Sequence, residues 1–349
     1  MSPARQIAFE VLRKVRAGGH ASDLLLKDAA ALTTRDAGLA TEIVFGCLRR
    51  QAQLDHLIEL LASSRLDPEI RIALRMGIYQ LRYMDRIPAH AAVGESVELA
   101  KRARKRSAAG LVNAVLRRVD RKPIAWPDRA AYLSTPEWLL EKWDRQFGSE
   151  TAETIARAFL KPAKTYVAET GRIQDIGAQS VVPHLDLHPG LTFLDLCAAP
   201  GNKTAQALAC GVRTIACDVN WHRLSQLGDL DCPRVVLDAT RALPFHAEFD
   251  RILVDAPCSG TGTLSRNPEI KWRLQPPDLI DLHRKQVAML RSALDHLKPG
   301  GRLVYSTCSL EEEENRAVLA AVPGPWRVTE RLPGIQEGDG FFVAVLTSE

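Results

Sequence analysis

The sequence predicts an all-helical domain followed by a doubly wound, Rossmann-like α/β domain. In residues 1–121, apolar residues recur at spacings of three and four, as in "EIRIALRMGIYQLRYM", which is typical of amphipathic helices. From about residue 190, short apolar runs alternate with helical stretches, which indicates βαβ units and a mostly parallel sheet. These runs are continuously apolar, so we expect a sheet covered on both faces.

We expect three parts along the chain. Residues 1–122 form the helical domain, in which Asp67-Pro68 opens one helix because proline suits a first helical turn. Residues 123–172 form a linker and a short intermediate segment, since "KPIAWPDRAAYLSTP" holds three prolines and breaks the periodicity. Residues 173–349 form the α/β domain, with strands in "LTFLDL", "VRTIACD", "RVVLD", "DRILVD", "GRLVYST" and "FFVAVL".

Composition excludes several classes of protein. No apolar run approaches the roughly 18 residues that a membrane helix needs, and the N-terminus lacks the apolar centre of a signal peptide. The seven cysteines form no CxxC pair, which argues against a disulfide framework or a metal site and fits a reducing cytoplasm. We therefore expect a cytoplasmic protein without metal, acting as a monomer.

Positive charge is concentrated in the helical domain. Residues 1–122 carry a net charge of about +9 and the remainder about −5. The excess peaks in "KRARKR", which holds Lys101, Arg102, Arg104, Lys105 and Arg106. A solvated helix face would explain this run, and a polyanion partner such as RNA would explain it equally well.

Carboxylates follow four consecutive predicted strands, and the fifth strand ends in a cysteine. The acids are Asp195, Asp218, Asp238 and Asp255, and the fifth strand ends at Thr307-Cys308. Because ligands of doubly wound sheets bind at the carboxyl ends of the strands, this joint pattern predicts a site.

The loop after the first strand, "CAAPGNK", lies where a nucleotide-binding fold places its glycine-rich turn. It has one glycine, so a pyrophosphate is not indicated, and S-adenosylmethionine suits it better than a dinucleotide. Asp218 is placed for ribose hydroxyls and Asp238 for an adenine amino group. The expected cofactor residues are these two acids, Asp255 and the loop residues Cys197, Ala198, Ala199, Pro200, Gly201, Asn202 and Lys203.

Three stretches carry a resemblance to a known family. "LDLCAAPGNKT", "VDAPCSGTGTLSRNPEIKW" and "YSTCSLEEEEN" resemble motifs of the RNA cytosine carbon-5 methyltransferases, the Nop2/Sun/RsmB superfamily. "IQDIGAQ" and "LPGIQEGDGFFVAVL" look like the segment before that family's cofactor domain and its closing hairpin. The N-terminal stretch is similar to the NusB-like RNA-binding domain of the RsmB/Sun branch. The resemblance implies methylation of RNA, and we expect the substrate to be small-subunit (16S) ribosomal RNA.

The sequence departs from the family pattern at two places. Asn202 stands where the family usually has glycine, and we expect the loop to survive because Asn tolerates left-handed backbone angles. The segment "KPAKTYVAETGR" is short and lacks the family's Arg-x-Asn stretch, which bears on how RNA docks.

Chemistry alone allows either strand-end thiol to attack a cytosine. A thiolate that adds to carbon-6 makes carbon-5 nucleophilic, which is covalent catalysis. The resemblance assigns attack to Cys308 and product release to Cys258. We expect Asp255 to bond the cytosine ring, and Lys203 to hold Asp255 or the cofactor carboxylate.

Two polar stretches allow a structural or a functional interpretation. In "EEEE", Ser309 and Glu312 form a capping-box pattern, so a helix start is a better interpretation than a metal site. In "RNPEIKW", Lys271 and Trp272 could contact RNA phosphate and base, or could simply pack.

Two rival functions remain. A DNA cytosine methyltransferase would attack with Cys258, because Pro257-Cys258 matches the Pro-Cys of that class. An RNA-binding or ribosome assembly factor would keep the fold without catalysis. The NusB-like domain counts against the first rival, and the paired cysteines with the strand-end acids count against the second.

Overall fold

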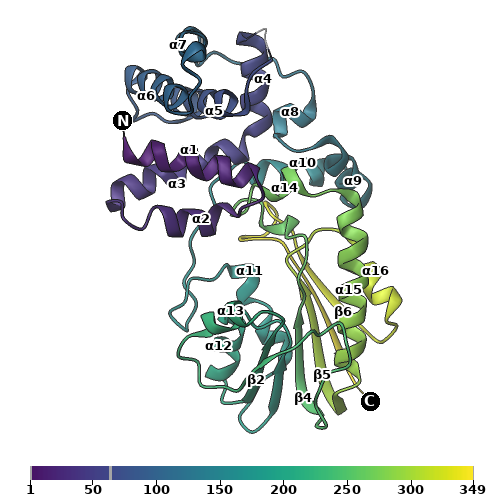
Figure 1. Cartoon of the computed structure of the whole chain (residues 1–349). Coiled ribbons are helices and arrows are strands. Elements are labelled where there is room, and N and C mark those ends of the chain that lie inside the picture. Colours follow the sequence, from purple (N-terminus) through teal and green to yellow (C-terminus); the bar gives the residue numbers. More distant parts are fainter. Residues whose placement is uncertain (1, 63–64, 349) are drawn as a thin grey trace. The chain divides into compact units, whose positions relative to one another are not determined.

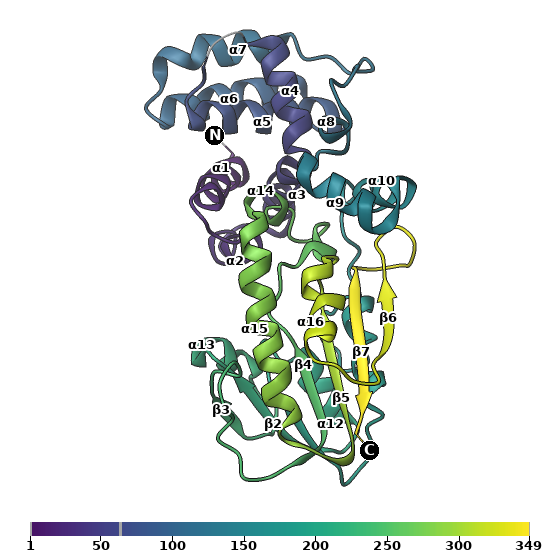
Figure 2. The same ribbon diagram turned by 90° about the vertical axis from the view of Figure 1, so that its right-hand side faces the viewer.

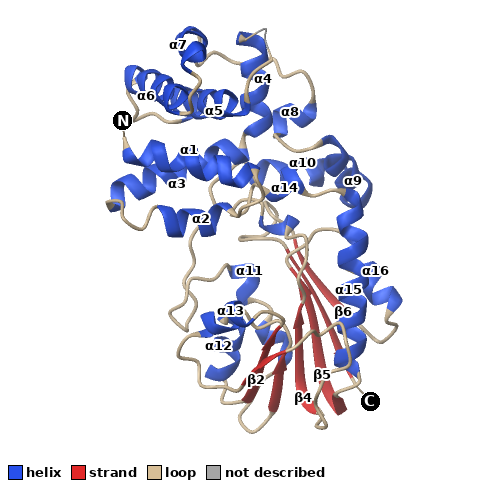
Figure 3. Cartoon of the chain, in the orientation of Figure 1, coloured by secondary structure: helices blue, strands red, loops and turns tan. Residues whose placement is uncertain are grey.

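The computed structural model describes residues 2–62 and 65–348, which form two compact units. The helical unit comprises the described residues up to Pro162 together with Leu264–Arg273, and the sheet unit comprises Ala163–Thr263 and the chain from Leu274. All strands lie in the sheet unit (Figure 3). No helix within the described ranges is long and apolar enough to cross a membrane.

The helical unit confirms the helical character predicted for the N-terminal part (Figure 1). Its helices are α1 (Pro3–Arg16), α2 (Ala21–Asp28), α3 (Thr34–Arg49), α4 (Gln51–Leu61), α5 (Pro68–Tyr83), α6 (Ala89–Arg102), α7 (Ala109–Arg117), α8 (Arg129–Leu133), α9 (Glu137–Phe147), α10 (Ser149–Ala158) and α14 (Ile270–Arg273). Pro68 occupies the first turn of α5, as predicted.

The core of the helical unit explains why these segments are helices. In α5, Ile70, Leu74 and Ile78 recur every four residues and are almost fully buried, and each such burial contributes about 1.5–3 kcal/mol. Helices α3 and α5 pack closely because Gly46 has no side chain: a Cβ there would lie 1.9 Å from the ring of Tyr79.

The expected linker is more ordered than its prolines suggest. Asp128 caps α8, with its Oδ1 accepting a hydrogen bond from the amide of Ala131 at 2.7 Å. Residues 123–162 belong to the helical unit, whereas the intermediate segment from Ala163 belongs to the sheet unit. The structure therefore divides the chain at a different point from the boundaries expected at 122 and 172.

The sheet unit holds seven strands in the order β3-β2-β1-β4-β5-β7-β6. The strands are β1 (Thr192–Asp195), β2 (Arg213–Asp218), β3 (Arg234–Val236), β4 (Phe249–Asp255), β5 (Leu297–Thr307), β6 (Arg327–Arg331) and β7 (Phe341–Thr347). β1 to β5 pair in parallel, and β7 pairs antiparallel with both β5 and β6. This is the predicted mostly parallel, doubly wound sheet. The strand order reverses between β1 and β4, which is where such sheets bind ligands.

Both faces of the sheet are covered, and the strands alternate between them. Phe193, Leu253 and Val304 pack in one apolar cluster, while their chain neighbours Leu194 and Ile252 pack in another. Helices α15 (Pro276–Leu294) and α16 (Arg316–Ala321) cover the second face (Figure 2). The remaining helices are α11 (Ile176–Gln179), α12 (Asn202–Ala209) and α13 (Trp221–Leu224).

A candidate active site at the carboxyl edge of the sheet

The loop between β1 and α12 makes a tight turn that one glycine permits. Gly201 has φ of +102°, and a Cβ there would lie 2.9 Å from Cγ and 3.2 Å from Cα of Leu227. Asn202 begins helix α12 and donates from Nδ2 to the carbonyl of Ile173 at 3.2 Å. The left-handed backbone angle is therefore at Gly201, and Asn202 is helical. We expected Asn202 to be tolerated because asparagine accepts left-handed angles, and that reason is wrong. The tight turn itself is present.

Asp195 ties this loop to the end of β1. Its Oδ2 accepts a hydrogen bond from Thr204 Oγ1 at 2.7 Å, and burial raises the pKa of this carboxyl to about 7. Burial likewise raises the pKa of Cys197 well above its usual value, and nearby carboxylates add to the effect. Cys197 and Asp195 thus form the floor of the loop.

Asp218 and Asp238 follow neighbouring strands but have different surroundings. Asp218 ends β2, is 4% exposed and accepts from the amide of Asn220 through Oδ1 at 2.9 Å. Asp238 lies two residues beyond the end of β3, and its Oδ1 accepts from the amide and hydroxyl of Thr240. Those hydrogen bonds lower the pKa of Asp238. Asp218 is the more enclosed of the two acceptors.

Lys203 and Asp255 form an ion pair at the switch point between β1 and β4. Lys203 Nζ lies 2.7 Å from Asp255 Oδ2, and Ser306 Oγ donates to Asp255 Oδ1 at 2.7 Å. Burial acts to lower the pKa of Lys203, but the carboxylate of Asp255 outweighs it and the pKa is raised. The ring of Phe341 lies 5.3 Å from Nζ. Lys203 therefore stays charged, and its ammonium group and the carboxylate of Asp255 hold each other in place.

The two strand-end thiols meet. Cys258 Sγ and Cys308 Sγ are 3.3 Å apart, although 50 residues separate them in the chain. The hydrogen bond to Cys308 and then burial raise the pKa of Cys258 well above its usual value. Lys203, Asp255, Cys258 and Cys308, predicted as the catalytic set, thus all lie along the carboxyl edges of β1, β4 and β5.

One buried acid, Glu314, organises the two loops that carry the thiols. Its carboxylate accepts from the amide of Ser259 at 2.8 Å, the hydroxyl of Ser309 at 2.5 Å, the hydroxyl of Ser259 and the amide group of Gln286 at 3.0 Å. Its carbonyl accepts from Tyr305 Oη at 2.6 Å. Four donors converge on one carboxylate, which fixes both loops in one geometry.

Sequence reasoning missed this role because it took the acidic run as a helix start. A 3₁₀ turn over Glu312–Glu314 follows Glu311, and the predicted capping box between Ser309 and Glu312 is absent. Ser309 Oγ instead donates to Glu314. A capping box is local, whereas two partners of Glu314, Ser259 and Gln286, come from the loop after β4 and from α15, which spacing along the chain does not reveal.

Lys271 does not have the surroundings of an RNA contact. It is 1% exposed, and Nζ donates to the carbonyl of Arg49 at 3.0 Å. Trp272 Nε1 donates to the carbonyl of Leu48 at 2.8 Å. These residues belong to the docking segment, Leu264–Arg273, which packs within the helical unit. The expected phosphate contact by Lys271 is therefore wrong, and the packing alternative holds for it.

The basic segment, Lys101–Arg106, is not one helical face. Helix α6 ends at Arg102, and Arg104 has φ of +61°. Lys101 pairs with Glu98 at 2.6 Å and Lys105 with Asp67 at 2.9 Å. The exposed guanidinium groups in this segment are those of Arg102, Arg104 and Arg106.

Known families match the two units separately. Residues 2–121 match the NusB family, and residues 182–324 match the family described as 16S rRNA methyltransferase RsmB/F. Two crystal structures share the fold. PH0851 has a TM-score of 0.80 and 20% identity over 100% of this chain and 99% of its own. A methyltransferase homologue from Pyrococcus horikoshii has a TM-score of 0.54 and 24% identity over 64% of this chain and 100% of its own.

Full-length relatives give the same result. The ribosomal RNA small subunit methyltransferase B of Thermus thermophilus is 35% identical over 97% of this chain and 93% of its own length. The probable enzyme of that name from Bacillus subtilis is 31% identical over 91% of this chain and 87% of its own. The chain therefore belongs to the RsmB/F family of 16S rRNA methyltransferases.

Proposed function

We propose that this protein methylates carbon-5 of a cytosine in small-subunit ribosomal RNA, through a covalent adduct on Cys308. The observation that carries the proposal is the contact between the thiols of Cys258 and Cys308 at 3.3 Å, on the same sheet edge as the Lys203–Asp255 ion pair. A methylation site needs a nucleophile, a group for the ring and a way to release the product, and these four side chains can supply them.

The residues at the switch point fit S-adenosylmethionine, which supplies the methyl group when bound. Asp218 is buried, and the one ion-pair partner of its Oδ2 within the described residues, Arg223, is 4.0 Å away, so this oxygen can accept from ribose hydroxyls. The turn at Gly201 leaves no room for a side chain. The small loop residues Ala198 and Ala199 would line the cofactor, and Asp238 would accept from the adenine amino group.

In the chemical step, the thiolate of Cys308 forms a bond to carbon-6, and the electrons of the C5–C6 double bond would attack the methyl carbon of S-adenosylmethionine while the bond from that carbon to the sulfonium sulfur breaks, its electrons staying on the sulfur. Asp255 holds the ring through its nitrogen edge, and Lys203 keeps Asp255 oriented at 2.7 Å. Solvent water then takes the carbon-5 proton, the electrons of the C5–H bond re-form the double bond, and the C6–S bond breaks with its electrons returning to the sulfur. These steps return Cys308 as a thiolate.

The contact between the thiols supports a division of labour between them. The two sulfurs lie close enough to share a proton, which either of them could donate, and we assign Cys308 as the nucleophile because the motif that carries it matches that of the family. Cys258 then acts at the elimination step. The exposed arginines of the helical unit would hold RNA phosphates, and the protein would work in the cytoplasm as a monomer.

Denaturing electrophoresis with labelled RNA and S-adenosylmethionine tests this assignment. Cys308→Ala should lose both methylation and covalent capture, whereas Cys258→Ala should accumulate a cofactor-dependent protein–RNA adduct. Cys232→Ala, a cysteine between β2 and β3, is the matched control and should behave as wild type. Capture by Cys308→Ala and not by Cys258→Ala would reverse the roles, as in a DNA-type mechanism. Wild-type protein that methylates no RNA would favour an assembly factor.

A further inference from the structure

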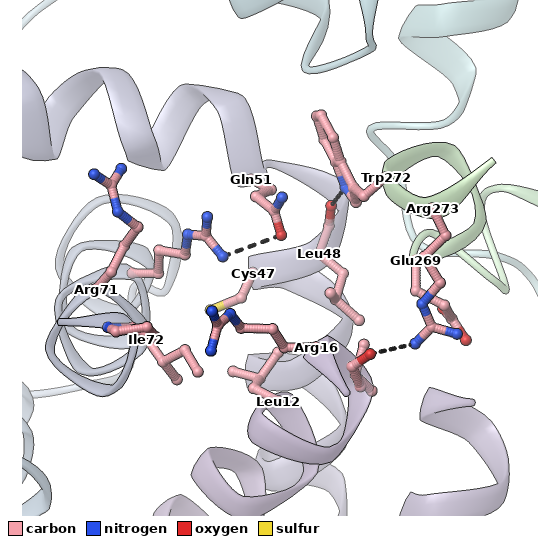
Figure 4. Close-up of a pocket in the computed structure, with 13 residues that line it drawn as sticks. Leu12, Arg16, Cys47, Leu48, Gln51, Arg71, Ile72, Glu269, Trp272 and Arg273 are labelled. Carbon is pink, nitrogen blue, oxygen red and sulfur yellow. Dashed lines mark hydrogen bonds between the residues drawn. The ribbon is translucent and has the colours of Figure 1, made fainter. Parts of the chain in front are cut away.

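The helical unit contains a pocket of about 230 Å³ that is partly open to solvent (Figure 4). Helices α1 and α5, the α3–α4 junction and the docking segment line it. Its walls combine apolar side chains such as Leu12 and Ile72 with guanidinium groups and one indole. Nearly half of the lining residues are charged or polar, so the pocket suits a ligand that carries charge as well as an apolar face.

The lining is positively charged. It includes Arg16, Arg71, Arg75 and Arg273 against the single carboxylate of Glu269. Arg75 and Arg71 share Asp55, at 2.6 Å and 3.2 Å, and Arg273 donates to carbonyls of α1 and the turn after it. Arg16 is exposed and, among the described residues, makes no ion pair. Figure 4 shows its side chain extending across the pocket toward Cys47.

The docking segment adds two groups that suit a base. The indole of Trp272 lines the pocket while its N–H is held by the carbonyl of Leu48 at 2.8 Å, so the ring has a fixed orientation. Glu269 is 1% exposed and accepts from the amide of Ala21 at 2.9 Å through Oε1. Its Oε2 is buried with no hydrogen-bond partner in the described part of the chain. A buried acceptor without a donor is costly, so a donor from a ligand would stabilise it.

We propose that this pocket holds one nucleotide extruded from the RNA substrate. Arg16 and Arg71 would contact the phosphate, Trp272 would stack on the base, and Glu269 would shift to accept from an exocyclic amino group. The inference rests on the proposed function, because it assigns the pocket to the same RNA. The helical unit would then recognise one base of the RNA, in addition to attracting the phosphates of the RNA.

Arg16→Gln and Arg13→Gln form a matched pair that tests the proposal. Both residues lie in the last turn of α1 and are exposed, so each change removes the same charge near a helix C-terminus. Arg13 pairs with Glu10 at 2.8 Å and does not line the pocket. Arg16→Gln should weaken RNA binding about three- to tenfold and reduce the salt slope by about one, whereas Arg13→Gln should change neither.

Kinetics and cross-linking separate this site from the chemistry. Arg16→Gln should raise the KM for RNA and leave kcat and S-adenosylmethionine affinity unchanged. Ultraviolet cross-linking of wild-type protein to 4-thiouridine-labelled RNA should attach a nucleotide to the peptide that contains Trp272. Calorimetry with each nucleoside monophosphate tests whether the pocket takes a nucleotide of the RNA or a free nucleotide. Tight binding of a monophosphate that RNA does not displace would mean a free-nucleotide site and would overturn the proposal.

The outcomes also distinguish this inference from the proposed function. If wild type methylates RNA but Arg16→Gln and Arg13→Gln bind RNA equally, the nucleotide pocket is wrong and the methyltransferase assignment stands. If cross-links map to other peptides alone, the pocket is again wrong. If wild type binds RNA through Arg16 without methylating it, the pocket stands and the proposed reaction fails.

Discussion

Lys203 and Lys271 are both buried lysines, but their partners differ. Lys203 lies 2.7 Å from the carboxylate of Asp255, whereas Lys271 donates to a backbone carbonyl at 3.0 Å, with no carboxylate within ion-pair distance among the described residues. Burial acts to lower both pKa values. The pKa of Lys203 is nevertheless raised by Asp255, while that of Lys271 falls to about 7, helped by the nearby charges of Arg49 and Arg50. A nearby carboxylate therefore keeps a buried lysine charged, whereas a buried lysine without one loses its proton more readily.

The largest expected effect is a difference in methylation activity between variants of these two lysines. Lys203→Met leaves the half-buried carboxylate of Asp255 without its cation, so we expect methylation to fall about 10³-fold or more. Lys271→Met removes a docking group of the helical unit, and we expect activity within about tenfold of wild type. The measurement is transfer of labelled methyl groups to RNA, with circular dichroism to verify folding. Equal loss in two folded variants would remove the distinction.

The sequence could predict the reaction site better than the docking segment for a physical reason. Asp255, Cys258 and Cys308 follow apolar runs whose ends a parallel sheet must bring together, and Lys203 follows the loop after the first such run, so their proximity could be predicted. The motif "VDAPCSGTGTLSRNPEIKWR" gives no sign that it changes unit at Leu264. Lys271 is buried by residues more than 200 positions away, and neither composition nor spacing encodes that contact.

Glu314 is a buried acid that we expect to act by holding the two thiol loops in place and not by reacting with the substrate. Glu314→Gln replaces one acceptor oxygen with a donor that faces the hydroxyls of Ser259 and Ser309, so we expect stability to fall by about 2–4 kcal/mol. Methylation should fall more than S-adenosylmethionine affinity, because the thiol loops lose their shared anchor. Urea unfolding and calorimetry measure the two effects. Glu312→Gln, an exposed acid of the same run, is the control.

The two strand-end acids of the cofactor region should also differ. Asp218→Ala should weaken S-adenosylmethionine by about 1–3 kcal/mol, because a buried acceptor is lost. Asp238→Ala should cost less, since the side chain of Asp238 is 41% exposed and already bonded to Thr240. Calorimetric titration of both folded variants measures this difference. Equal losses would mean that exposure does not determine their contributions.

The lowered pKa of Lys271 predicts a pH dependence of stability. Above about pH 7 the folded protein releases the proton while the unfolded chain keeps it up to its usual pKa of 10.5, so unfolding takes up a proton. The stability contributed at this site should therefore rise with pH from about 7 to about 10, by at most about 1.4 kcal/mol per pH unit. Urea unfolding of wild type minus Lys271→Met isolates the slope. A difference that is flat with pH would show that Lys271 stays charged.

The smallest expected effect concerns cations that are already paired within the basic segment. Replacing Arg102, Arg104 and Arg106 with glutamine should weaken RNA binding and flatten its salt dependence by about one slope unit per lost phosphate contact. Replacing Lys101 and Lys105 should change the slope less, because Glu98 and Asp67 hold their ammonium groups. Filter binding at several salt concentrations measures both slopes, with S-adenosylmethionine affinity as the control. If neither set alters the slope, the basic segment is a solvated surface, and the arginines of the pocket remain as the sites of RNA attraction. If the lysine pair matters as much as the arginines, the ion pairs open on binding, and the exposed charges alone do not define the RNA-binding surface.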